Sequence, residues 1–224
     1  MAQRGGVFRE MTKGRLEAFS DGVLAIAITL LTLDLPVPLP GSPAVEEHGL
    51  AWALAESWPK IAAYVVSFAV IGIIWVNHHG LINRIAVVDR TLLFINLLLL
   101  LFVAAIPWAT NLFAEYLKEG GRDSHVAAAV YSANALCVAL AFNLFWVWIL
   151  RDRRRLHQSI DSEVARGQAR RFGFGILVYA LAVGVSFISA PWTLAMHGAV
   201  AVYYVVDQLP RGAEADAESE PEVE

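Results

Sequence analysis

A polar cluster stands at the start of the first long apolar run in this sequence. Arg15, Phe19, Ser20 and Asp21 precede a stretch of mostly aliphatic residues that continues to Leu35. A carboxylate inside a bilayer is costly unless water or a polar side chain accompanies it, so we expect Asp21 to have a partner. Such side chains either join neighbouring helices or take part in the movement of ions and protons.

Polar side chains recur where the second apolar run ends and where the third begins. Trp75, Asn77, His78 and His79 close the second run, and Asn96 lies about two helical turns into the third. In a chain that crosses a membrane back and forth, these positions reach the same depth as the start of the first run. The spacing of Trp75, His78 and His79 predicts that they share one helix face. These groups could therefore donate hydrogen bonds to the carboxylate of the first run.

Several kinds of chemistry were weighed for this set of side chains. We favour a structural network of hydrogen bonds that fixes helix packing, because polar groups commonly join helices in membranes. A proton relay through Asp21 and His78 stays open, because both side chains can exchange protons. We expect no metal site, because adjacent residues such as His78 and His79 rarely converge on one ion.

The sequence predicts neither an enzyme nor a cofactor. Ser20 neighbours Asp21, but the spacing places no histidine where it could activate the hydroxyl. Glycine-rich phosphate-binding motifs are not found in the sequence either.

Composition and charge place these residues in a membrane protein. Hydrophobic residues make up 57% of the 224 residues and charged residues 17%, and the charges collect between the apolar runs. This pattern is typical of an all-α, multi-pass membrane protein rather than of a soluble core. Each of six runs has about the length that crosses a bilayer. The predicted spans are 16–35, 58–79, 91–113, 126–150, 172–189 and 192–206.

The basic residues predict the orientation of the chain. If there are six spans, 14 of the 17 lysines and arginines lie on the side of the N-terminus. Cytoplasmic loops carry such an excess, so both termini are predicted to be cytoplasmic and the protein to lie in the cell membrane. The arginine-rich segment between the fourth and fifth spans is explained by topology and by contact with the lipid bilayer. We therefore expect no nucleic-acid partner.

An apolar row runs along the first predicted span. Ile26, Leu30 and Leu33 are separated by four and three residues, so they lie on one stripe of the helix, flanked by Thr29. If copies of this helix surrounded an axis, the row would form rings that keep a pore dry and closed. Asp34 would add negative potential at the outer mouth and favour cations. The spacing alone is also that of an ordinary membrane helix.

The polar cluster and the polar residues of the next two runs resemble the signature of the transmembrane protein 175 family, the prokaryotic relatives of a lysosomal potassium channel. The resemblance extends over about residues 13–208, because the six-span layout also fits. The residues that carry it are Arg15, Phe19, Ser20, Asp21, Trp75, Asn77, His78, His79, Asn96 and Pro107.

The resemblance implies a homotetramer of six-helix subunits, with the first helix around the central axis and potassium as the preferred permeant ion. By position relative to the motif, Ile26, Leu30 and Leu33 match the family's pore-lining hydrophobic positions, and Thr29 matches a position linked to selectivity. The resemblance also assigns a structural hydrogen-bond network. Its members would be Arg15, Ser20, Asp21, Trp75, His78 and Asn96.

A proton leak or a proton-coupled transporter using Asp21 and His78 is the alternative. Transporters usually show internal repeats or broken helices, and the sequence shows neither, so this alternative ranks below the channel. Residues 1–208 are predicted to form the six-span channel domain. Residues 209–224 carry six acidic side chains within the last eleven positions and are predicted to form a disordered cytoplasmic tail. No function is assigned to the proline-rich loop 36–57.

Overall fold

The computed structural model describes residues 13–155 and 162–208, and every regular element within these ranges is helical. The predicted all-α class is therefore confirmed. Four helices are long and apolar enough to cross a membrane. They are α1 (Lys13–Leu30), which continues as the 3-10 turn η1 (Leu31–Asp34), α4 (Trp58–Asn83), α5 (Arg90–Tyr116) and α6 (Gly121–Leu150).

The last two helices differ from the prediction mainly at their starts. A 3-10 turn, η2 (Arg153–Arg155), follows α6. The helix α7 (Ser162–Ser186) begins at Ser162 rather than at residue 172, and its apolar part is Gly173–Ser186. The stretch 162–171 has too few apolar residues to belong to the predicted membrane span, but its arginine, alanine and glutamine residues are good helix formers. The final helix is α8 (Ala190–Gln208).

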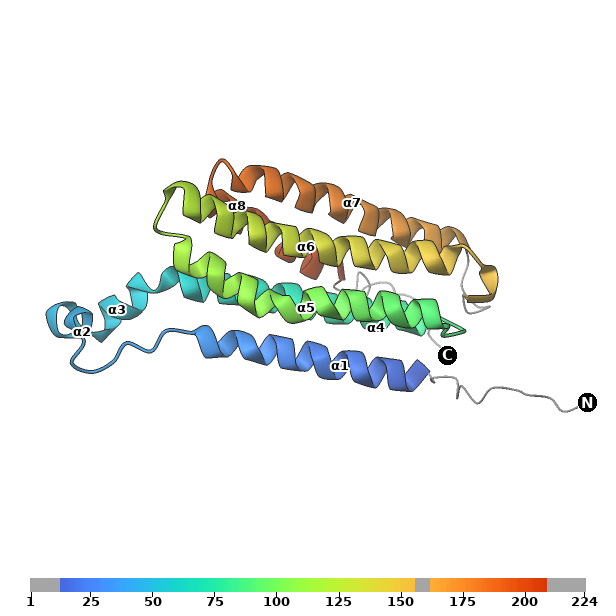
Figure 1. Ribbon diagram of the computed structural model, residues 1–224, viewed down its shortest axis with the longest axis horizontal. Helices are drawn as coiled ribbons and strands as arrows, with labels where there is room; N and C mark the ends of the chain where they lie inside the picture. Colours follow the sequence, from blue (N-terminus) through green and yellow to red (C-terminus); the bar gives the residue numbers. More distant parts are fainter. Residues whose placement is uncertain (1–12, 156–161, 209–224) are drawn as a thin grey trace, which may run out of the picture.

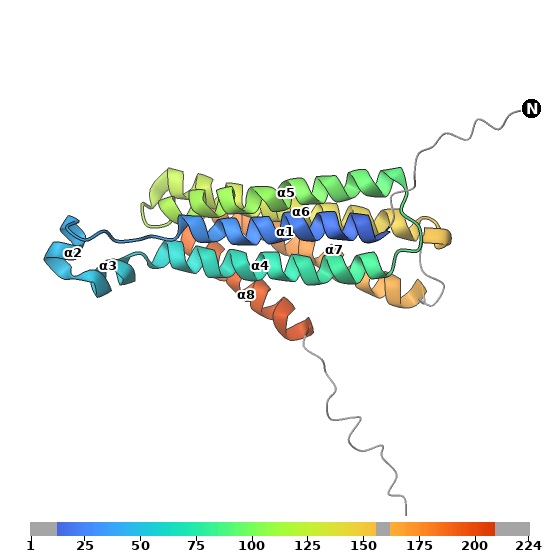
Figure 2. The same ribbon diagram turned by 90° about the horizontal axis from the view of Figure 1, so that it is seen from below.

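The segment predicted as a loop between the first two spans contains two short helices. These are α2 (Pro43–His48) and α3 (Leu50–Glu56), and they extend beyond the end of the main bundle (Figures 1 and 2). Pro43 suits the first turn of α2, because the backbone N–H that proline lacks would have no hydrogen-bond partner within the helix at this position. Gly49 separates the two helices at a φ of 83°, a left-handed conformation that favours glycine. The predicted acidic tail, 209–224, lies outside the described residues.

The helix α1 lies at one edge of the bundle. It packs against α4 and α5, whereas α6 packs against α5, α7 and α8 (Figures 1 and 2). The face of α1 that packs is apolar apart from Ser20, and its buried residues recur every three or four positions. They are Leu16, Ser20, Leu24 and Ala27.

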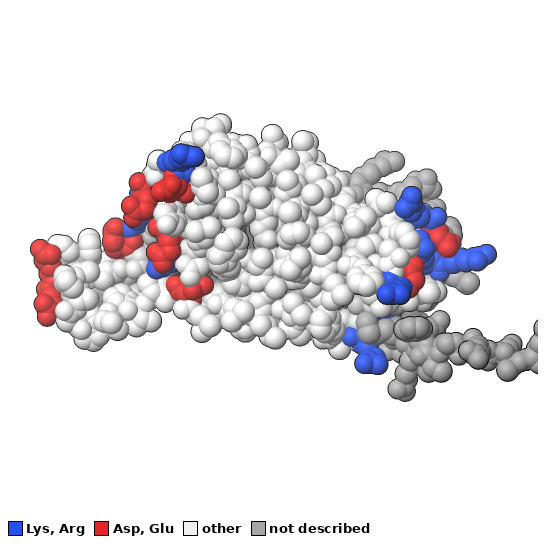
Figure 3. Space-filling model, viewed as in Figure 1, with Lys and Arg blue, Asp and Glu red and all other residues white. Residues whose placement is uncertain are grey.

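Charged side chains avoid the middle of the molecule. In Figure 3 the described acidic and basic residues gather at the two ends of the bundle, and a broad band between them carries none. Large apolar side chains such as Phe94, Leu101 and Leu181 are exposed, each by more than half of its surface. A charge-free, apolar waist around hydrogen-bonded helices is what a bilayer requires of a protein that crosses it.

A cluster of buried hydroxyl groups, which the sequence analysis did not single out, joins three helices. Thr110 of α5 donates a hydrogen bond to Ser67 of α4 at 2.8 Å, and Ser67 is also bonded to the Tyr131 hydroxyl of α6 at 2.9 Å. All three side chains are buried. Buried hydroxyl groups in a membrane protein have no water to bond with, so these three groups form hydrogen bonds with one another. The cluster thereby holds α4, α5 and α6 together.

We expect Ser67→Ala to lower the stability of the folded protein by about 0.5–2 kcal/mol, because it leaves the Tyr131 hydroxyl without this partner. The measurement is the midpoint of thermal unfolding in detergent. Ser42→Ala is the matched control, since the Ser42 side chain makes no capping hydrogen bond to α2. An equal shift in both variants would contradict a role for the cluster.

Candidate functional site

A relay of buried hydrogen bonds connects α4, α5 and α1 near the end that carries the N-terminus of α1. His78 Nε2 lies 2.9 Å from Asn96 Oδ1, and Asn96 Nδ2 donates to Ser20 Oγ at 2.9 Å. Ser20 Oγ in turn donates to the Leu16 carbonyl of its own helix at 2.9 Å. Since Asn96 Oδ1 can only accept, His78 must carry its proton on Nε2. Every bond then runs in one direction, from α4 through α5 to α1.

The relay is fully withdrawn from solvent. The exposed fractions of Ser20, His78 and Asn96 are 0%, 0% and 1%. His78 also contacts Phe145 of α6 edge to face, with 6.4 Å between ring centroids. Unpaired polar groups at this depth would each cost about 1–3 kcal/mol, so the bonds among His78 Nε2, Asn96 and Ser20 stabilise the packing. His78 Nδ1 makes no hydrogen bond to the described part of the chain.

A second set of contacts lies beside the relay and is more open to solvent. Trp75 Nε1 donates to Asp21 Oδ1 at 3.0 Å, and His79 Nδ1 lies 2.8 Å from Glu17 Oε1. His79 Nε2 is also bonded to Asn83 at 3.0 Å. Glu17 was not among the residues predicted for this site. The available signal was its spacing, because Glu17 and Asp21 are four residues apart, as are their partners Trp75 and His79.

The three side chains predicted to share one helix face, Trp75, His78 and His79, contact two different neighbouring helices. Trp75 and His79 point to α1, whereas His78 points to Asn96 of α5. The reason is geometric. Positions i and i+4 nearly superpose along a helix, but i+3 is rotated away by about 60°, which suffices to reach a different neighbour.

Three residues of the predicted network lie elsewhere in the described subunit. Arg15 and Phe19 are exposed, and together with Leu93 and Leu97 they line a shallow hollow beside Asn96. Asn77 lines a separate cavity among α4, α5, α6, α7 and α8. The structure therefore brings together Ser20, Asp21, Trp75, His78, His79 and Asn96.

The apolar row of the first helix faces away from the bundle. Ile26, Leu30 and Leu33 are 61%, 41% and 78% exposed, and Thr29 is exposed beside them. Thr29 Oγ1 lies 2.9 Å from the carbonyl oxygens of Ala25 and Ile26, so its hydroxyl is bonded within the helix. An unpartnered apolar face of this kind can meet lipid or another protein chain.

The end of the row that lies farther from the N-terminus is held separately. Asp34, in η1, accepts a hydrogen bond from the Asn111 amide of α5. The relay fixes α1 to its neighbours near its start, and this contact fixes it near its end. The orientation of α1 about its own axis is therefore set, and with it the direction in which the exposed row points.

Within residues 13–155 and 162–208, no group of three or more histidine, cysteine or acidic side chains is close enough to hold a metal ion. The polar side chains of the site are instead paired across helices. These pairings connect α1 to α4 and α5.

The fold and the site together define a multi-pass helical membrane protein whose first helix is clamped on one face and free on the other. Residues 15–107 match the family described as endosomal/lysosomal potassium channel TMEM175. A protein from Streptomyces collinus named a potassium channel is 53% identical over 197 residues, which cover 88% of this chain and 93% of that protein. The chain belongs to the TMEM175 family, as the polar motif predicted.

A crystal structure and an animal protein are also similar to this chain. The crystal structure of a lysosomal potassium-selective channel TMEM175 homolog from Chamaesiphon minutus matches with a TM-score of 0.78 and 36% identity, over 88% of this chain and 98% of that one. The endosomal/lysosomal proton channel TMEM175 of Gallus gallus is 33% identical over 151 residues. The chain covers only 30% of that animal protein's length.

We expect Asn96→Leu to destabilise the protein by about 1–3 kcal/mol, because both His78 and Ser20 lose a buried partner. Thermal or urea unfolding in detergent measures the loss. Asn111→Leu makes the same change on the same helix at a more exposed hydrogen bond, and we expect a smaller loss there. Equal losses would contradict a special role for the buried relay.

Proposed function

We propose that this chain is a subunit of a potassium-preferring channel of the cell membrane, assembled as a homotetramer. Its fold matches a structure described as potassium-selective, and a relative with 53% identity is named a potassium channel. In this proposal α1, α4, α5, α6, α7 and α8 are the six spans, and both termini are cytoplasmic. Residues 1–208 form the channel domain, and residues 209–224 form an acidic cytoplasmic tail.

The observation that carries the proposed pore is the exposed row on α1. One face of the first helix is exposed and carries Ile26, Leu30 and Leu33. The opposite face packs against α4 and α5. A helix clamped on one face and apolar on the other can meet its copies around a symmetry axis. We propose that four such rows enclose the pore.

The three residues would constrict the pore as stacked rings. Their positions span about 10 Å along the helix, enough to keep a narrow passage free of water. An ion crossing it must lose part of its hydration, which is costly, so the rings limit conduction. We propose that Thr29 contributes to selectivity and that Asp34 attracts cations to the outer mouth.

The buried relay and its neighbours would act on the pore indirectly. Arg15, Ser20, Asp21, Trp75 and Asn96 touch no permeant ion in this proposal. Ser20, Asp21, Trp75, His78, His79 and Asn96 fix how α1 is rotated, and the rotation decides which side chains meet at the axis. Potassium is the permeant ion, and the mechanism needs neither a cofactor nor a bound metal. The channel has no enzymatic step.

We expect Ile26→Asn and Leu30→Ala to raise ion leak by about tenfold, which corresponds to about 1.4 kcal/mol off the barrier. The polar side chain wets the constriction, and the smaller one widens it. Both should also reduce the preference for potassium over sodium. Potassium and sodium flux into liposomes containing purified protein measures both effects.

Leu177→Ala, on an exposed position of α7, is the control for Leu30→Ala, and we expect unchanged flux. Unchanged flux in both α1 variants would exclude these residues from the constriction. A flux that follows pH and ignores potassium would instead support the alternative, in which Asp21 and His78 serve a proton leak or proton-coupled transport.

The purified protein should contain four copies of the chain. Native mass spectrometry of the detergent-solubilised protein counts them directly. We expect Leu33→Lys to weaken the assembly, because it places charges of one sign in a closed apolar ring. A stable monomer or dimer of the unmodified chain would exclude the pore as described.

A further inference from the structure

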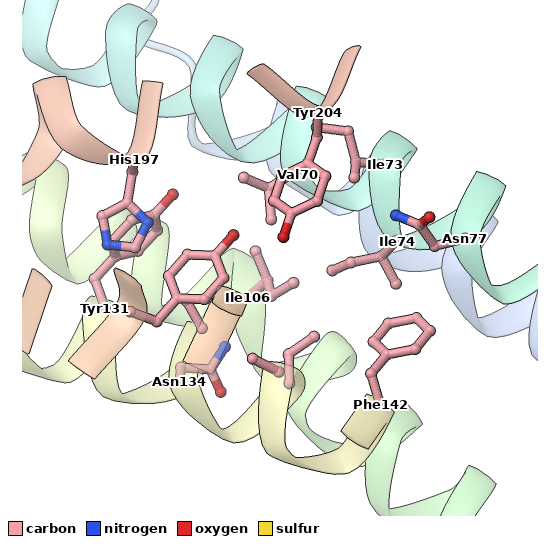
Figure 4. A pocket seen from close by; sticks show the side chains of 15 residues that line it. Val70, Ile73, Ile74, Asn77, Ile106, Tyr131, Asn134, Phe142, His197 and Tyr204 are labelled. Carbon is pink, nitrogen blue, oxygen red and sulfur yellow. The ribbon is translucent and has the colours of Figure 1, made fainter. Parts of the chain in front are cut away.

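A cavity of about 60 Å³ lies inside the subunit, among α4, α5, α6, α7 and α8. Figure 4 shows Val70 and Ile73 of α4, Phe142 of α6 and Tyr204 of α8 turned toward this space. Its lining takes no residue from α1, so it is separate from the proposed pore. A single water needs only about 10–15 Å³, so the space admits something larger.

One buried polar atom at the cavity has no partner. His197 of α8 is 1% exposed, and its Nε2 lies 3.0 Å from Ser132 Oγ of α6. Its Nδ1 makes no hydrogen bond to any part of the chain that the structure describes. A buried nitrogen without a partner is destabilising, so this atom indicates a missing ligand.

Fixed contacts keep the cavity from collapsing onto His197. The imidazole packs between the rings of Tyr131 and Tyr179, with centroid distances of 4.7 and 5.5 Å. Tyr131 is itself held by the buried hydroxyl cluster through its bond to Ser67. The wall beside His197 is therefore rigid, and the space persists as a preformed site.

We propose that this cavity binds a small uncharged alcohol or phenol whose hydroxyl group bonds to His197 Nδ1. A hydroxyl both donates and accepts, so it satisfies this nitrogen in either tautomer of the imidazole. The body of the ligand lies against Val70, Ile106 and Val138, whose side chains offer only apolar contact. Among the described residues that line the site there is no lysine, arginine or carboxylate, so a charged ligand would find no partner in them.

Water alone fits this site less well than an alcohol does. An ordered buried water makes about two to four hydrogen bonds, and apolar cavities stay dry and take up small apolar molecules. A hydroxyl-bearing molecule meets both demands, because one end pairs with the imidazole and the rest packs against the apolar side chains of the lining.

The test uses 3-azibutanol, a photoreactive alcohol, on the purified full-length protein in lipid nanodiscs. After illumination, mass spectrometry should find the label on residues of α6 and α8 that line the cavity. Phenol should suppress this labelling about tenfold more effectively than benzene at equal concentration in the bilayer, because benzene leaves the imidazole nitrogen unpaired. Equal suppression by both would overturn recognition of the hydroxyl.

Two matched variants locate the site. Ala135→Phe fills the cavity and should abolish the competed labelling, whereas Ala133→Phe makes the same change on an exposed position of α6 and should preserve it. The phenol and benzene comparison on the unmodified protein decides the question if Ala135→Phe fails to fold. Label confined to exposed residues such as Leu181 and Val202, without competition, would overturn the proposal.

Discussion

The hydrogen-bonded relay from His78 through Asn96 to Ser20 is the constraint on which the rest of the structure depends. In a bilayer no water is at hand to satisfy buried polar groups, so these side chains must find one another. Three helices that are distant in sequence can satisfy them at only one relative rotation. That rotation fixes which face of α1 packs against α4 and α5 and which face stays free.

The exposed apolar face of α1 distinguishes it from the helices at the centre of the bundle. The helix α6 is covered by neighbours on several sides, whereas the helices packed against α1 among the described residues are α4 and α5. Ile26 and Leu33 therefore remain exposed in the subunit although they are as apolar as its core. The pore that we propose between copies of the chain depends on this asymmetry, and the Asp34–Asn111 contact helps to hold α1 in place.

The same physical rule acts deeper in the subunit. Ser67, Thr110 and Tyr131 satisfy one another, but His197 is left with one unpaired nitrogen beside a space that its neighbours cannot close. The two polar clusters thus have different consequences. The relay near the start of α1 fixes the relative rotation of three helices. The cluster around His197 borders a cavity in which we propose that a small alcohol or phenol binds. Neither depends on a charged side chain within the charge-free waist of the molecule.

The sequence by itself determined the helical class, the four helices that are long and apolar enough to cross a membrane among the described residues, and the polar motif of the family. Hydropathy over about 20 residues needs no knowledge of neighbours. It also identified Asp21, Trp75, His78 and Asn96 as polar residues of one depth. Only the tertiary structure decided the pairing. Glu17 pairs with His79, and Asn77 lines a separate cavity. The partner of a side chain depends on how its helix is rotated against its neighbours, and a periodic pattern of apolar residues does not determine that rotation.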